Sequence, residues 1–156
     1  MFTRYYVYLD HPFADVWAVV FAQPSPDILA LDGGDGEELL ARVGIRLAGI
    51  PVYKHVKLQL GAPYVIRRGA QAVLPVRWKP TGGPPLFPDM YGDLAFQPFG
   101  PDRTQMTLSA GYRPPGGKLG AAVDEAALHL LADATIRDFS LRLAAAIDRA
   151  LAPTAA

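Results

Sequence analysis

The feature that most constrains this chain is a long helical pattern near its C-terminal end. From about Leu119 to Leu151, neither proline nor glycine occurs after Gly120. The pattern therefore predicts one helix of roughly 30 residues and about 45 Å. Apolar side chains recur at helical spacing along one side of it, at Ala121, Leu128, Ala132, Ile136, Phe139, Leu143, Ile147 and Ala150. A helix with one long apolar side has to be covered by an extended partner surface.

Residues 45–112 supply that surface, because their hydrophobic pattern alternates with a period of two. In residues 52–60 the apolar and polar side chains lie on opposite faces. One face carries Val52, Val56, Leu58 and Leu60, and the other carries Tyr53, His55, Lys57 and Gln59. The same alternation recurs over residues 69–79 and 104–112. A one-sided antiparallel sheet is therefore expected.

The N-terminal part completes an α+β layout. The aromatic and β-branched run from Phe2 to Leu9 predicts a strand, and residues 12–22 predict a short helix. A second short helix is expected around residues 36–43, ended by Gly44. The predicted fold class is α+β, a curved antiparallel sheet wrapped around a long C-terminal helix, with two short helices after the first strand. We expect a single domain over residues 1–152 and a frayed tail over 153–156.

Composition argues against several classes of function. The 15 basic and 15 acidic residues balance, which argues against a nucleic-acid partner and against a polybasic membrane-surface protein. The chain has no cysteine, so disulfides, thiol catalysis and cysteine-ligated metals are excluded. No apolar run reaches the ~18–20 residues of a membrane span, and the start of the chain has no secretory pattern. We therefore expect a cytoplasmic protein without stable membrane insertion.

No motif for a cofactor or a metal is present in the sequence. The three histidines, at positions 11, 55 and 129, show no metal-ligand spacing. The glycine-rich stretch at residues 33–36 lacks the lysine that follows in a phosphate-binding loop. We therefore predict neither a cofactor nor a metal.

The order of elements resembles the START-related superfamily, which includes lipid-transfer domains and polyketide cyclases and dehydratases. The resemblance rests on the opening strand running into residues 11–17 (HPFADVW), on the closing helix through residues 139–143 (FSLRL), and on residues 111–120 leading into Asp124. These last residues look like a bacterial branch of the superfamily. The resemblance implies the helix-grip fold. It carries no shared catalytic signature.

A curved sheet around a long helix leaves space between the two, and we expect a hydrophobic small molecule there. Residues with large apolar bodies and polar or soft tips suit such a ligand, and Leu128 and Ala132 face the same space from the helix. The candidate ligand-binding residues are Tyr5, Trp78, Met106, Tyr112, Leu128 and Ala132. The alternative is that each of these side chains only fills the core.

Glu125 and His129 are the candidate catalytic residues. They lie four positions apart on the predicted helix, hence side by side, near its apolar side. A carboxylate beside an imidazole at the mouth of an apolar cavity can act as an acid–base pair. The alternative is a helix end that leaves both side chains in water, and His129 is also four residues from Asp133.

Three functions are compatible with these patterns. The first is a carrier or sensor of a hydrophobic small molecule, such as a lipid, an isoprenoid or a polyketide-like aromatic compound. The second is an enzyme of the cyclase or dehydratase type, in which the Glu125–His129 pair or a tyrosine such as Tyr112 moves a proton. The third is a non-catalytic interaction protein whose groove is filled by its own side chains, with a homodimer as one form. The loop over residues 80–88 is either a lid of the cavity or a plug of the core.

Overall fold

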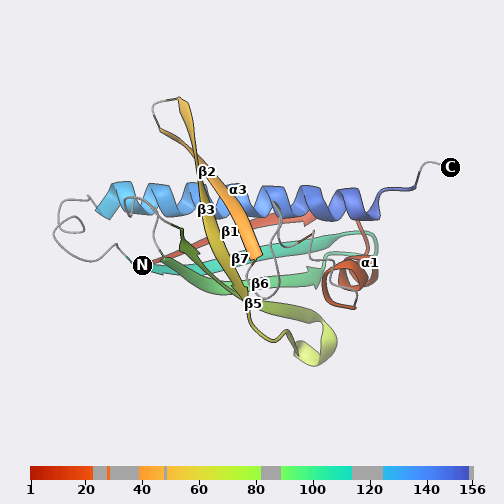
Figure 1. Cartoon of the computed structure of the whole chain (residues 1–156). Helices are drawn as coiled ribbons and strands as arrows, with labels where there is room; N and C mark the ends of the chain where they lie inside the picture. The colour runs from red at the N-terminus through yellow and green to blue at the C-terminus, as the bar shows by residue number, and fades with distance from the viewer. Residues whose placement is uncertain (23–27, 29–38, 48, 82–88, 114–124, 155–156) are drawn as a thin grey trace.

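The computed structural model describes residues 1–22, 28, 39–47, 49–81, 89–113 and 125–154, without the side chains of residues 39–47, 52–54 and 125. Figure 1 shows a twisted sheet with one long helix lying across it. The described strands are all paired antiparallel, in the order β1-β7-β6-β5-β3-β2, and β4 pairs with β5 as well. Their bounds are β1 (Phe2–Leu9), β2 (Leu39–Leu47), β3 (Ile50–Leu60), β4 (Tyr64–Ile66), β5 (Gln71–Pro80), β6 (Asp89–Pro98) and β7 (Thr104–Arg113).

The long C-terminal helix α3 (Glu125–Leu151) packs against both edge strands of the sheet, β1 and β2. Contact with both edges means that the sheet curves around the helix, and the predicted α+β helix-grip architecture is confirmed. The apolar side predicted from the sequence is buried at Leu128, Ala132, Ile136, Phe139, Leu143 and Ile147, whereas Ala150 is exposed. No helix among the described residues is both long and apolar enough to cross a membrane.

The core lies between α3 and the face of the sheet turned toward it. The rings of Trp78 in β5 and Phe139 in α3 lie with their centroids 5.1 Å apart. Met90 in β6 and Met106 in β7 are fully buried beside them in the same cluster. Most of the inward-facing residues predicted from the alternating pattern are buried, namely Val56 and Leu58 in β3, Ala72, Leu74, Val76 and Trp78 in β5, and Met106, Leu108, Ala110 and Tyr112 in β7. Ala70, which the pattern places on the same face, is exposed, and Val73 is buried although it has the opposite parity.

Of the two short helices expected after β1, the first is confirmed in the described residues. Residues 12–22 form α1 (Phe13–Trp17) and then a single π-helical turn, η1 (Ala18–Ala22), as expected for the first helix. A third short helix, η2 (Arg67–Gly69), connects β4 to β5.

The helix expected around residues 36–43 is wrong over the part that the structure describes. Leu39–Leu47 is strand β2, and all nine of its residues pair with β3. The turn between the two strands contains Gly49 with φ of +83°, a conformation that suits glycine. Pairing in a long hairpin therefore outweighs the helical preference of the Leu-Leu-Ala-Arg stretch.

Candidate functional site

A pocket of about 320 Å³ lies at the seam between the edge strand β1 and helix α3. We call it the seam pocket. Two of its lining residues come from β1 and four from a single turn of α3, namely Arg4, Tyr5, Asp133, Ala134, Ile136 and Arg137. It therefore combines an aromatic ring and two aliphatic side chains with two guanidinium groups and a carboxylate.

The pocket exists because β1 is an edge strand. Its inward side chains are Thr3, Tyr5, Val7 and Leu9, of which Thr3 and Leu9 are buried while Tyr5 and Val7 are only partly covered. Because no described strand lies beyond β1, the inward face is accessible between the edge of the sheet and the helix. Tyr5 is thus accessible in the seam, although its neighbours in β1 belong to the core.

A line of hydrogen-bonding side chains runs beside the seam pocket. The Tyr112 hydroxyl oxygen, on β7, lies 2.8 Å from Nδ1 of His129, on α3. On the other side of the imidazole, Nε2 lies 3.5 Å from a carboxylate oxygen of Asp133, one helical turn further on. Thr3 donates its hydroxyl hydrogen to the other oxygen of Asp133. The four side chains form a continuous Tyr112–His129–Asp133–Thr3 chain across two strands and the helix.

The ends of this chain differ in their access to water. Tyr112 is 1% exposed, whereas the side chains of His129 and Asp133 are each about half exposed, at 49% and 47%. An ionised carboxylate only accepts hydrogen bonds, so Asp133 favours the imidazole tautomer with its proton on Nε2. Nδ1 then accepts from the Tyr112 hydroxyl, which gives this buried polar group a partner.

The structure separates the candidate residues into two groups. Tyr5 lines the seam pocket, and Tyr112 contacts His129. The other four candidate ligand-binding residues lie in the close-packed core, namely Trp78, Met106, Leu128 and Ala132. The side chain of Glu125, the first residue of α3, lies outside the described residues. The predicted Glu125–His129 pair therefore stays a prediction.

Sequence reasoning missed Thr3, although a signal for it was present. Thr3 has the same parity as Tyr5 and Leu9 in the first strand, so it is a hydroxyl on an otherwise apolar face. A buried hydroxyl needs a partner, and that partner is Asp133, 130 positions away in the sequence. Within the described part of the chain, no group of three or more His, Cys, Asp or Glu side chains is placed to hold a metal ion.

Comparisons with known proteins support the fold. No protein-family model and no curated protein matches the sequence. Among solved structures, the chain is similar to a conserved protein from Geobacillus kaustophilus, at 19% identity and a TM-score of 0.58, with 96% of this chain and 97% of that chain covered. It is also similar to the Zhui aromatase/cyclase from Streptomyces sp. R1128, at 18% identity and a TM-score of 0.53, with 100% and 99% covered.

A third similar structure is Ara h 8.0201, at 12% identity and a TM-score of 0.50, with 96% of each chain covered. All three likenesses extend over nearly the whole chain, so they concern the complete arrangement of sheet and helix. They show the fold that the resemblance to the START-related superfamily implies, the helix grip. At these identities the likeness is one of fold.

Proposed function

We propose that the chain binds a hydrophobic small molecule in the seam pocket, between the sheet and the C-terminal helix. The observation that carries this proposal is the pocket itself, whose volume of about 320 Å³ is at the lower end of the range for small-ligand sites. Tyr5, Ala134 and Ile136 offer the apolar surface. Behind the pocket, the rings of Trp78 and Phe139 are buried in the core with their centroids 5.1 Å apart, and we place the ligand at the seam.

The polar rim of the pocket supports a ligand that also carries oxygen atoms. Arg4 and Arg137 are donors, and Asp133 is an acceptor. An aromatic wall with a few converging polar groups is the common composition of small-molecule sites. A similar structure is that of an aromatase/cyclase, which favours a polyketide-like aromatic compound over a lipid chain as the ligand class.

Filling the seam pocket should weaken ligand binding. We expect Ala134→Phe to weaken binding of the uncharged dye N-phenyl-1-naphthylamine at least about tenfold, the equivalent of ~1.4 kcal/mol. The matched control is Ala150→Phe, at an exposed position near the end of the same helix, and it should bind like the parent chain. The measurement is the rise in dye fluorescence on titration. Equal affinities for the parent and both variants would exclude the seam pocket as the dye site.

A second function, acid–base catalysis, is favoured by one specific observation. The Asp133 carboxylate lines the pocket and is held by Thr3 and His129. In this reading Asp133 takes the proton from a carbon next to a bound carbonyl group. The electron pair of the broken C–H bond forms a carbon–carbon double bond, and the π pair of the carbonyl group moves to its oxygen, which gives an enolate. His129 and Thr3 are positioning residues that fix the carboxylate.

Removal of the Asp133 charge tests the catalytic reading. With 2-acetylnaphthalene in deuterated water, we expect the parent chain to accelerate deuterium exchange of the methyl protons, followed by NMR. Asp133→Asn should lose about 100-fold of that acceleration, because a positioned acid or base contributes at least this much. Asp138→Asn is the control, since Asp138 lies on the same helix in an ion pair with Arg142. Exchange that is no faster than in buffer, or that survives in Asp133→Asn, would leave ligand binding as the function.

A further inference from the structure

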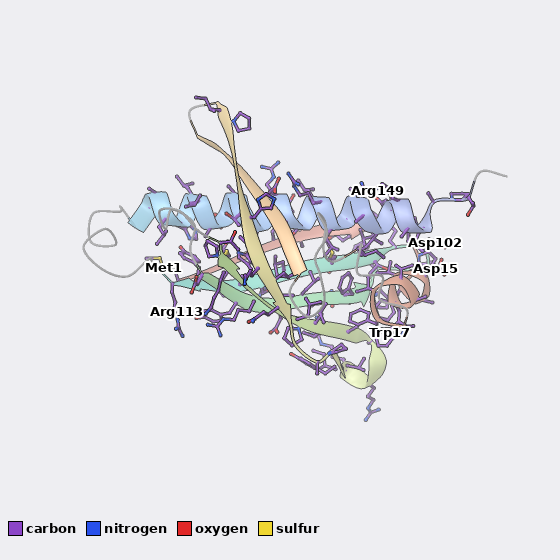
Figure 2. All side chains as sticks on the ribbon, viewed as in Figure 1. Met1, Asp15, Trp17, Asp102, Arg113 and Arg149 are labelled. Atoms are coloured by element: carbon purple, nitrogen blue, oxygen red, sulfur yellow. The ribbon has the colours of Figure 1, made fainter. Side chains whose placement is uncertain are left out.

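A second and larger hollow, of about 690 Å³, lies on the face of the sheet that points away from α3. We call it the outer hollow. Its lining residues on β1 and β7, and the side chains of Tyr91, Asp93 and Ala95 on β6, alternate with the inward-facing residues of these strands. Phe2 and Arg4, for example, flank the buried Thr3. Figure 2 shows Met1, a lining residue, at the end of the sheet that also carries Arg113, beside the start of α3. The outer hollow and the seam pocket thus lie on opposite faces of the sheet, and they share one lining residue, Arg4, on the edge strand β1.

The floor of the outer hollow is made of small residues on the two central strands. Gly92 and Ala95 come from β6, and Ser109 and Gly111 come from β7. Gly111 is essential to this shape, because a Cβ there would lie 2.7–2.9 Å from ring atoms of Tyr91. The lack of a side chain at this position lets the Tyr91 ring lie flat against the sheet.

Aromatic side chains form the walls. Phe2 on β1, Tyr91 on β6 and Tyr64 on β4 are 57%, 48% and 46% exposed. The Arg4 guanidinium lies over one face of the Phe2 ring, 5.6 Å from its centroid, and the opposite face is left for a ligand. The Arg113 guanidinium lies 5.7 Å from the centroid of the Tyr91 ring and helps to fix its position. Flat walls above a floor of small residues suit a planar ring system that stacks on them.

Two opposite charges flank the floor at a defined spacing. Arg4 on β1 donates from Nε to the Ser109 hydroxyl oxygen on β7, at 3.0 Å. Asp93 on β6 is the direct cross-strand neighbour of Ser109 on the other side. The backbones of Arg4 and Asp93 are therefore two strand spacings apart, about 9–10 Å. A guanidinium has five N–H donors, so the bond to Ser109 leaves donors for a ligand.

We propose that the outer hollow binds a planar aromatic acid that carries a hydrogen-bond donor at the end opposite its acid group. The fused rings stack against Tyr91 and Phe2, which lie on either side of Gly111 in the sheet. The carboxylate of the ligand pairs with Arg4, and its hydroxyl or amino group donates to Asp93. This site goes beyond the proposed function, because it lies on the opposite face of the sheet and takes a charged ligand.

Three probes of the same ring system test the proposal on the full chain by isothermal titration calorimetry. They are 6-hydroxy-2-naphthoate, 2-naphthoate, which lacks the donor, and 2-naphthol, which lacks the acid. We expect the first to bind about fivefold tighter than either of the others, as one hydrogen bond contributes. Asp93→Ala should make the two acids equal. Arg4→Gln should reduce 6-hydroxy-2-naphthoate to the affinity of 2-naphthol, and 2-naphthoate to a weaker affinity than that, because it then has neither polar contact. Equal affinity of all three probes for the parent chain would overturn the proposal.

Matched variants locate the binding to this face. Tyr91→Ala should weaken 6-hydroxy-2-naphthoate about fivefold, by loss of the stacking surface. Tyr6→Ala is the control, because Tyr6 is 55% exposed on the same face of β1 and does not line the hollow. Thermal melts verify that both variants are folded.

Ala134→Phe, which fills the seam pocket, should leave this binding unchanged. If it abolishes the binding, the acid occupies the seam pocket and the proposal for the outer hollow is wrong, whatever the result with the uncharged dye.

Discussion

Replacement of Phe139 by alanine is expected to lower the free energy of unfolding by about 3–5 kcal/mol, the usual cost for a buried phenylalanine. The Phe139 side chain is fully buried, and its ring packs on that of Trp78 at 5.1 Å. The contact joins the long helix to strand β5, so its loss removes apolar burial and leaves a cavity in a core that relaxes only partly. In a chain of this length the melting temperature should fall by roughly 10 °C.

The control for this change lies two residues further along the same helix. Leu141 is 43% exposed, so Leu141→Ala removes a side chain of comparable character with little loss of burial. It should change the free energy of unfolding by no more than about 0.5 kcal/mol. Both values come from denaturant titrations evaluated with a common slope. A loss below ~1 kcal/mol for Phe139→Ala would contradict its place in the centre of the core.

The parts of the fold that the sequence predicts are those encoded by local periodicity. Leu128, Ile136 and Leu143 recur at helical spacing, and Val56, Leu58 and Trp78 fall on the inward side of alternating strands. Each of these side chains is buried in the structure. Periods of 3.6 and 2 are properties of single elements, so they can be read without knowing the neighbours.

The prediction of a helix over residues 36–43 is wrong in the described part because the structure there depends on a neighbouring strand and not on local periodicity. The stretch around Leu39 and Leu40 has good helix formers, but it becomes a strand because β3 is available as a hairpin partner. The energy of that pairing depends on the residues of β3, beginning at Ile50. Local propensity is a weak guide in such a case, since tertiary context overrides it.

The candidate site was only half predictable for a similar reason. Tyr5, Tyr112 and His129 are identifiable one at a time, as polar tips on apolar faces. Their relation depends on the register of β1 against β7 and on the rotation of α3 about its axis. Neither quantity follows from a single element, so the Tyr112–His129 bond and the contact of Thr3 with Asp133 appear only in the folded chain.

A second large effect is expected at Gly92, where backbone atoms of β7 leave no space for a Cβ. A Cβ on Gly92 would collide with the Ser109 carbonyl oxygen and would lie 2.7 Å from the Cα of Ala110, its cross-strand partner. Both obstacles are backbone atoms, so the ladder between two central strands has to shift. We expect Gly92→Ala to lower the free energy of unfolding by about 3 kcal/mol, at the upper end of the usual range for overpacking.

Gly111→Ala is the matched variant, because it adds the same methyl group in the neighbouring strand. There the new Cβ meets only the outer end of the Tyr91 ring, a half-exposed side chain that can rotate away. Its cost should stay below about 1 kcal/mol, since alanine is also less flexible than glycine in the unfolded chain. Denaturant titration of both variants gives the comparison, and equal losses would contradict the close approach at Gly92. The displaced Tyr91 ring no longer forms its wall of the outer hollow, so Gly111→Ala should weaken 6-hydroxy-2-naphthoate binding while the fold remains intact.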